Sequence, residues 1–221
     1  MPITVSASSS GPKKEPVPAG THHAVCYGVV AIGTQPSTQF TPRPKVLLVF
    51  ELPNERMNIQ GKDVARSLTK RYTLSLNEKS SLFKDLQSWR GRPFTPAELA
   101  GFDVSKLIGA NCFLSVIHQE RAGSMYANIG GISGLPKGMK SVTSENPPMY
   151  FNLLEEIDRA KKMGLRDINW EKQDLETWIQ KLCCESEEYK AFVMGSPNAE
   201  PPDAPAEEDL QPAEDDQSVP F

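Results

Sequence analysis

The sequence predicts a mainly β fold, in which a small five-stranded barrel carries one helix between its third and fourth strands. Segments with the composition of strands recur through the first 140 residues, and one clearly helical segment interrupts them. Basic residues prevail in this part of the chain, whereas acidic residues prevail in the last part. We therefore expect a barrel, C-terminal helices and a disordered acidic tail.

Five segments are expected to form strands, because they are rich in β-branched and aromatic residues or alternate in polarity. They are residues 21–33, 45–53, 70–76, 111–119 and 125–132. Gly28 lies in the middle of the first segment, where a bend or bulge tolerates a missing side chain. The polar residues 54–67 are expected to form the connection between the second and third strands.

In the third strand, Tyr72 and Leu74 alternate with Arg71 and Thr73. A period of two places the first pair on a core face and the second pair on a polar, basic face. The same rule places Tyr126 and Asn128 together on an outer face of the fifth strand. The predicted strands therefore present polar side chains that can bind a ligand.

The helix after the third strand has one apolar face, because Leu82, Leu86 and Trp89 are spaced at i, i+4 and i+7. Asn77 or Ser80 can cap its start. Two roles are open for Trp89, stacking on a nucleic-acid base or packing in the core. Its alignment with the two leucines favours the core.

Gly91 suits a left-handed cap at the end of this helix, and Thr95–Glu98 is a capping box that starts a second, short helix. Three strands, a helix and two strands is the element order of the OB-fold, a five-stranded Greek-key barrel. Strands two and three of an OB-fold and the adjoining loops bind oligonucleotides or oligosaccharides. A ligand of this kind is therefore expected here.

Composition divides the chain into four parts. They are a disordered arm (1–20), the OB-fold domain (21–140), a helical extension (141–194) and a disordered acidic tail (195–221). In the extension, apolar residues at helical spacing predict helices over residues 152–162 and 174–194.

The net charge of −4 results from strongly segregated charges. Residues 1–140 carry 17 Lys and Arg against 9 Asp and Glu, residues 141–194 carry 7 against 11, and residues 195–221 carry none against 8. The excess of basic residues over residues 1–140 favours a polyanionic ligand for this part of the chain. The acidic tail can compete with that ligand or bind a basic partner.

Several other classes of protein are not indicated. No apolar run approaches the roughly 20 residues of a membrane span, and the first residues lack the apolar segment of a secretory signal. The four cysteines have no zinc or disulfide spacing, and His22, His23 and Cys26 lack a second ligand pair. The acidic residues show no nuclease-like cluster. We expect a cytoplasmic protein that is not an enzyme and holds no cofactor or metal.

The candidate nucleic-acid-binding residues are those that strand parity or loop position places outside the core. They are Arg43, Lys45, Arg66, Lys70, Arg71, Thr73, Arg90, Arg92, Tyr126 and Asn128. Basic side chains bind phosphates, and aromatic rings stack on bases. For Arg90 and Arg92, a solvated helix end is an equally open interpretation.

The central block, about residues 19–140, contains KVLLVFEL, KRYTLSLNEKSSLFKDLQSWRGRPFTPAEL, GFDVSKLIGANCFLSVIH and YANIGGISGLPKG. It resembles single-stranded DNA-binding proteins of tailed bacteriophages, an OB-fold family implicated in replication. The resemblance implies binding and protection of single-stranded DNA during phage DNA replication or recombination, in the host cytoplasm. The barrel sequence differs from the bacterial type, so the tetramer of that type is not implied.

The end of the sequence includes Asp215, Asp216, Pro220 and Phe221. It resembles the acidic tip, ending in Pro-Phe, of bacterial single-stranded DNA-binding proteins. That resemblance implies that the tip recruits replication or recombination proteins, and a solubilising tail is the alternative. For the whole chain, the alternative is an OB-fold module for protein interaction or virion structure that does not bind DNA.

Overall fold

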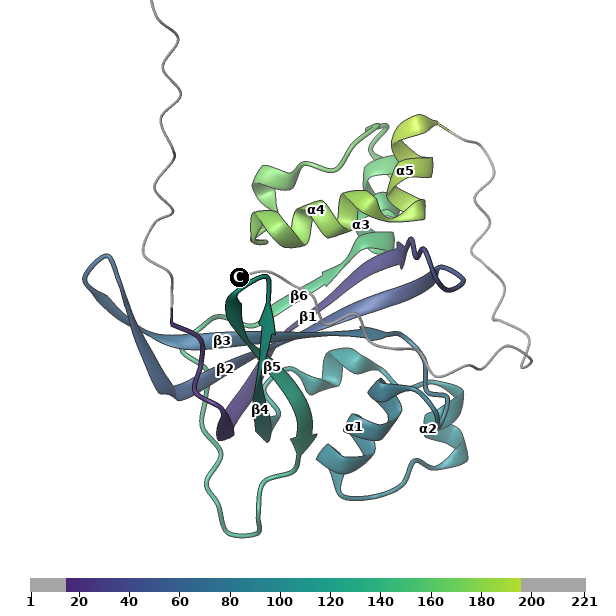
Figure 1. The fold of residues 1–221 in the computed structure, drawn as a ribbon. Helices are drawn as coiled ribbons and strands as arrows, with labels where there is room; N and C mark the ends of the chain where they lie inside the picture. Colours follow the sequence, from purple (N-terminus) through teal and green to yellow (C-terminus); the bar gives the residue numbers. More distant parts are fainter. Residues whose placement is uncertain (1–14, 196–221) are drawn as a thin grey trace, which may run out of the picture.

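A computed structural model describes residues 15–195 and shows a mainly β protein (Figure 1). The strands are β1 (Gly20–Gln35), β2 (Arg43–Ile59), β3 (Lys62–Thr73), β4 (Asn111–Arg121), β5 (Ser124–Ser133) and β6 (Met149–Asn152). The helices are α1 (Ser81–Arg90), α2 (Pro96–Ala100), α3 (Leu153–Lys162), α4 (Thr177–Glu185) and α5 (Glu187–Met194), with short 3-10 turns η1 (Val104–Leu107) and η2 (Trp170–Lys172). Among the described residues, no helix is long and apolar enough to cross a membrane.

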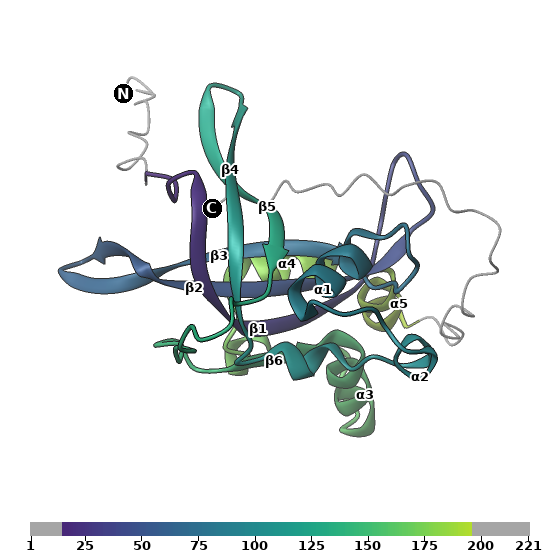
Figure 2. The same cartoon turned by 90° about the horizontal axis from the view of Figure 1, so that it is seen from below.

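The sheet is antiparallel along the order β3-β2-β1-β4-β5, and β6 pairs in parallel with β1. It curls strongly, so that β4 and β5 turn away from the direction of β2 and β3 (Figure 2). β1 makes this possible because its first residues pair with β4 and its later residues pair with β2. A bulge interrupts the β1–β2 register between Cys26 and Gly28, and a Cβ on Gly28 would lie only 2.9 Å from Val49 Cβ. The expected bend at Gly28 is confirmed.

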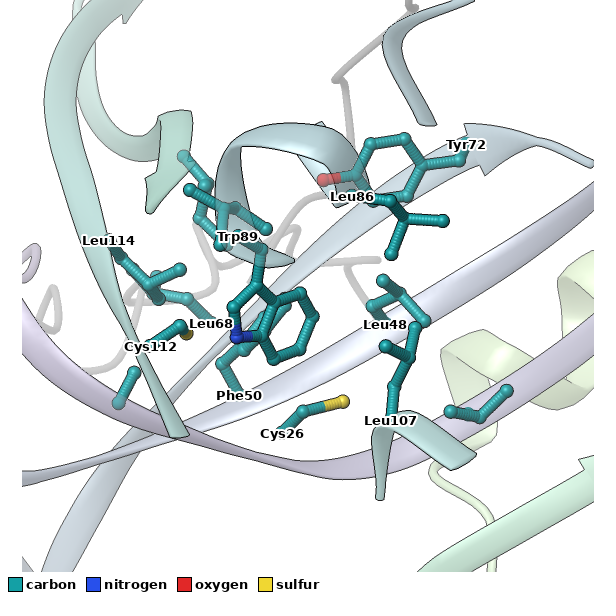
Figure 3. Packing of buried hydrophobic residues seen from close by; sticks show 14 of the residues in the cluster. Cys26, Leu48, Phe50, Leu68, Tyr72, Leu86, Trp89, Leu107, Cys112 and Leu114 are labelled. Atoms are coloured by element: carbon teal, nitrogen blue, oxygen red, sulfur yellow. The ribbon is translucent and has the colours of Figure 1, made fainter. Parts of the chain in front are cut away.

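The concave face of the sheet and helix α1 enclose the main core. Ser80 caps α1 through its side chain, and Gly91 ends it with a φ of 64°. Leu82, Leu86 and Trp89 are the buried residues of this helix. In Figure 3 the Trp89 ring lies among apolar side chains from several strands, and its centroid is 5.7 Å from that of Phe50. The core interpretation of Trp89 is therefore confirmed.

A second apolar cluster lies on the opposite, outer face of β1 and β2, under the C-terminal helices (Figure 1). Val30, Ile32 and Leu47 of the sheet pack there with Leu153 and Ile179 of α3 and α4. β6 leads directly into α3, so the extension begins as a strand of the sheet. The sequence analysis did not predict β6, because its four residues are too few to show a period.

The interpretation of residues 54–67 as a polar connection is wrong. β2 continues to Ile59 and β3 starts at Lys62, so a long hairpin occupies this stretch. Gln60 and Gly61 form its two-residue turn with positive φ values of 51° and 85°. Much of this hairpin is exposed to solvent on both faces, so polar side chains occur on both. The sequence therefore shows no alternation of polar and apolar residues here.

Three further boundaries differ from the sequence-based expectation. β3 ends at Thr73, and Leu74 is 41% exposed instead of lying in the core with Tyr72. The single helix expected over 174–194 is two helices, because Ser186 adopts an extended backbone and caps α5. Val17, at the end of the expected arm, is buried in the main core. Residues 1–14 of the arm and residues 196–221 of the acidic tail lie outside the described residues.

Candidate nucleic-acid interface

Three basic side chains cluster on the outer face of β2 and β3. In the antiparallel register Lys45 is opposite Thr73 and Leu47 is opposite Arg71, which makes Lys45 and Arg71 diagonal neighbours on one face. Arg43 precedes Lys45 by two residues and shares its face. We call Arg43, Lys45 and Arg71 the basic strip, whereas Thr73, which was expected to contact the ligand, is only 8% exposed.

The strip lies between the β1–β2 loop and the C-terminal helices. Lys45 Nζ donates a hydrogen bond of 2.8 Å to Thr73 Oγ1, which fixes the ammonium group over β3. Leu47, beside Arg71, is buried in the cluster that the C-terminal helices close. The loop residue Phe40 is 42% exposed three positions before Arg43. An exposed ring three positions from Arg43 suits stacking beside a phosphate contact, and Phe40 is not among the residues that the sequence singled out.

Lys70 is not part of this surface. It alternates with Arg71 and therefore faces the core, where it is 5% exposed and its Nζ lies 2.8 Å from Asp85 Oδ2 of α1. Tyr72 donates its hydroxyl to the same carboxylate oxygen at 2.7 Å. The buried ion pair ties α1 to β3, so the sequence-based assignment of Lys70 to DNA contact is corrected.

Arg66 also lies on the inner side of β3. Its Nη1 donates to Glu15 O at 2.6 Å and its Nε donates to Arg56 O at 3.3 Å. His118 contributes to the same N-terminal segment through Nε2, which lies 2.8 Å from Val17 O. Arg66 and His118 therefore bind the segment before β1 at Glu15 and Val17, and Arg66 lies on the opposite face of β3 from Arg71.

Arg90 and Arg92 are paired within the α1–α2 region. Both guanidinium groups bind Glu98, and Arg90 Cζ lies 4.3 Å from the centre of the Phe94 ring. The hydrogen bond from Arg92, followed by that from the Thr95 backbone, lowers the pKa of Glu98 to about 2. These arginines stabilise the capping box, and the structure places them with α1 instead of the outer face of β2 and β3.

Tyr126 and Asn128 lie on the same face of β5, as the alternation predicted. Asn128 Nδ2 donates to Gln119 Oε1 at 2.9 Å, and Arg121 Nη2 reaches the same oxygen at 3.3 Å. β5 and β3 are the two ends of the strand order. Tyr126 and Asn128 lie on β5, whereas the basic strip lies on β2 and β3.

The sequence analysis missed a pocket on the outer face, between β1, the segment before β6 and the loop before α4. Its volume is about 330 Å³, and its lining includes Tyr27, Asn146, Met149, Tyr150, Asp174 and Glu176. We call it the outer pocket. Burial raises the pKa of the Tyr27 hydroxyl, the hydrogen bond to Ser67 opposes this, and the nearby Glu176 and Glu51 carboxylates raise it further. No local sequence pattern reveals the pocket, because residues about 120 to 150 positions apart form it.

No family model matches the chain, and no curated protein matches it significantly. Within residues 15–195, no three His, Cys, Asp or Glu side chains are grouped closely enough to hold a metal ion.

Proposed function

We propose that the chain is an OB-fold protein that binds and protects single-stranded DNA without strong sequence preference during phage DNA replication or recombination. The sheet order, with α1 between β3 and β4, is compatible with that fold. The main support is the basic strip, because its three cations lie on the two strands with which OB-folds bind oligonucleotides.

The strip has the chemistry that a flexible strand requires. Arg43, Lys45 and Arg71 neutralise phosphates and release counterions, so binding depends on salt but not on sequence. Phe40 stacks on an unpaired base, and every base offers a π-face. A duplex hides its bases from such a ring, so the single strand is the preferred ligand.

The proposal is tested by titrating a fluorescent single strand and the matching duplex at two salt concentrations and measuring anisotropy. We expect the single strand to bind more tightly and its affinity to fall steeply as salt rises. Equal affinity for the two forms, or affinity independent of salt, contradicts the proposal. Absence of binding favours the alternative, an OB-fold module for protein interaction or virion structure.

For the acidic tail, which lies outside the described residues, we propose recruitment of replication or recombination proteins through Asp215, Asp216, Pro220 and Phe221. An apolar ring beside a carboxylate fits a pocket flanked by basic residues. Deleting Phe221 should remove specific proteins from those that the chain captures from a lysate of infected cells, whereas Leu210→Ala should not. An unchanged set of captured proteins would identify the tail as a solubilising segment.

A further inference from the structure

The outer pocket is a built site with walls from three parts of the chain. The Glu51 carboxylate is fully buried and accepts hydrogen bonds of 2.8 Å from the backbone N–H groups of Glu145 and Asn146. Asn146 Nδ2 donates to the same carboxylate at 2.6 Å, and Arg56 Nη1 lies 2.5 Å from Glu145 Oε1. These bonds fix the segment before β6 over the sheet, so the pocket exists before any ligand arrives.

Two carboxylates, those of Asp174 and Glu176, line the pocket beside the hydroxyl and amide groups of Tyr27, Tyr150, Asn146 and Gln173. Glu176 uses Oε2 to accept a 2.7 Å hydrogen bond from Trp178 Nε1, which orients its carboxylate. Asp174 makes no hydrogen bond or ion pair with any other residue of the described part of the chain. The described lining residues include no lysine, arginine or histidine. A phosphate is therefore disfavoured inside, and a group that donates hydrogen bonds is favoured.

The apolar walls suit a flat ring. Tyr27 of β1 and Tyr150 of β6 supply aromatic surface, and Met149 of β6 supplies a polarisable side chain. Unpaired bases are commonly held between aromatic and apolar side chains and bound through their Watson–Crick edges. The volume of about 330 Å³ lies in the range of small-ligand sites.

The pocket also continues the proposed DNA path. Tyr27 donates its hydroxyl to Ser67 Oγ at 3.2 Å, and Ser67 lies on the same face of β3 as Arg71. Ser67 and Arg71 are four positions apart, which is about 13 Å along the strand. A single strand whose phosphates contact the basic strip can therefore place a base at the pocket within a few nucleotides.

We propose that the outer pocket binds one nucleobase of the single strand and prefers guanine. Guanine presents two adjacent donors, N1–H and the N2 amino group, which one ionised carboxylate accepts together. Adenine and cytosine each offer an amino group beside an acceptor. Thymine offers one N–H between two carbonyl oxygens, which Asp174 and Glu176 repel. The proposal rests on the proposed function and adds a preference at one position to binding that is otherwise indifferent to sequence.

The test compares thymidine oligonucleotides of about 12 nucleotides that carry one central guanine, hypoxanthine or thymine. We expect guanine to bind about fivefold or more tightly than thymine, with hypoxanthine between them because it lacks the N2 amino group. In Glu176→Gln and Asp174→Asn, the ratio of guanine to thymine affinity should fall toward one. Glu171→Gln is the matched control, since Glu171 is an exposed acid nearby that does not line the pocket, and should keep the wild-type ratio.

The outcomes separate this inference from the proposed function. Salt-dependent binding of all oligonucleotides with equal affinity overturns the guanine site and leaves the proposed function standing, whereas no binding of any oligonucleotide contradicts both. A guanine preference that survives both pocket substitutions locates the selectivity elsewhere and overturns the site. A short peptide of arginine and lysine is titrated in parallel. If it binds in a Glu176-dependent manner while guanine shows no preference, the pocket is a peptide site and the inference is wrong.

Discussion

Replacing Trp89 with alanine is expected to lower the free energy of unfolding by about 3–5 kcal/mol. The ring is buried between α1 and the concave face of the sheet, and its Nε1 donates a 2.8 Å hydrogen bond to Asn111 O of β4. The substitution therefore leaves both a cavity and an unpaired carbonyl group. Urea denaturation followed by circular dichroism measures the change.

Leu99→Ala provides the control, because Leu99 is a large apolar residue that is 44% exposed on α2, and its substitution should have little effect. Should Trp89→Ala keep wild-type stability and lose only DNA affinity, the assignment of the core face and the ligand face of the sheet would have to be exchanged.

The second large effect concerns the basic strip. A variant with Arg43, Lys45 and Arg71 all replaced by alanine should bind single-stranded DNA on the order of 100-fold more weakly at low salt, since three contacts of about 1 kcal/mol each are lost. Anisotropy titration measures the loss. A matched variant with Lys84, Lys106 and Lys172 replaced by alanine removes the same charge from exposed positions elsewhere, and should keep nearly full affinity.

Two outcomes of this comparison would contradict the assignment of the strip. Equal losses in the two variants would show that net charge alone attracts DNA. An unchanged affinity in the strip variant would place the DNA elsewhere on the protein. A thermal melt of each variant establishes that it is folded before its binding is measured.

The elements that the sequence predicted correctly are those with a strong local signal. The apolar face and caps of α1 and the capping box at Thr95 all lie within a few residues of one another, and each is confirmed. The alternation in β3 placed Arg71 and Tyr72 on opposite faces correctly. The mainly β fold and the presence of C-terminal helices are also as expected.

The errors arise where tertiary contacts decide the outcome. Lys70, at the start of the alternating segment, was predicted to lie outside the core and contact DNA, yet it shares the face of Tyr72 and pairs with Asp85 under α1. Arg90 and Arg92 are held by Glu98, a partner six to eight residues away that composition does not reveal. The outer pocket is formed by β1 and segments after residue 145, so no local pattern could predict it.

The claim that the basic strip neutralises DNA phosphates is tested most directly by the salt dependence of binding. The logarithm of the association constant is measured against the logarithm of salt concentration for the wild type and for the variant lacking Arg43, Lys45 and Arg71. Each phosphate contact on a single strand contributes about 0.7 to the slope, so the variant should have a slope shallower by about 2. Parallel lines for the two proteins would show that these three side chains do not contact phosphates, and would contradict the account.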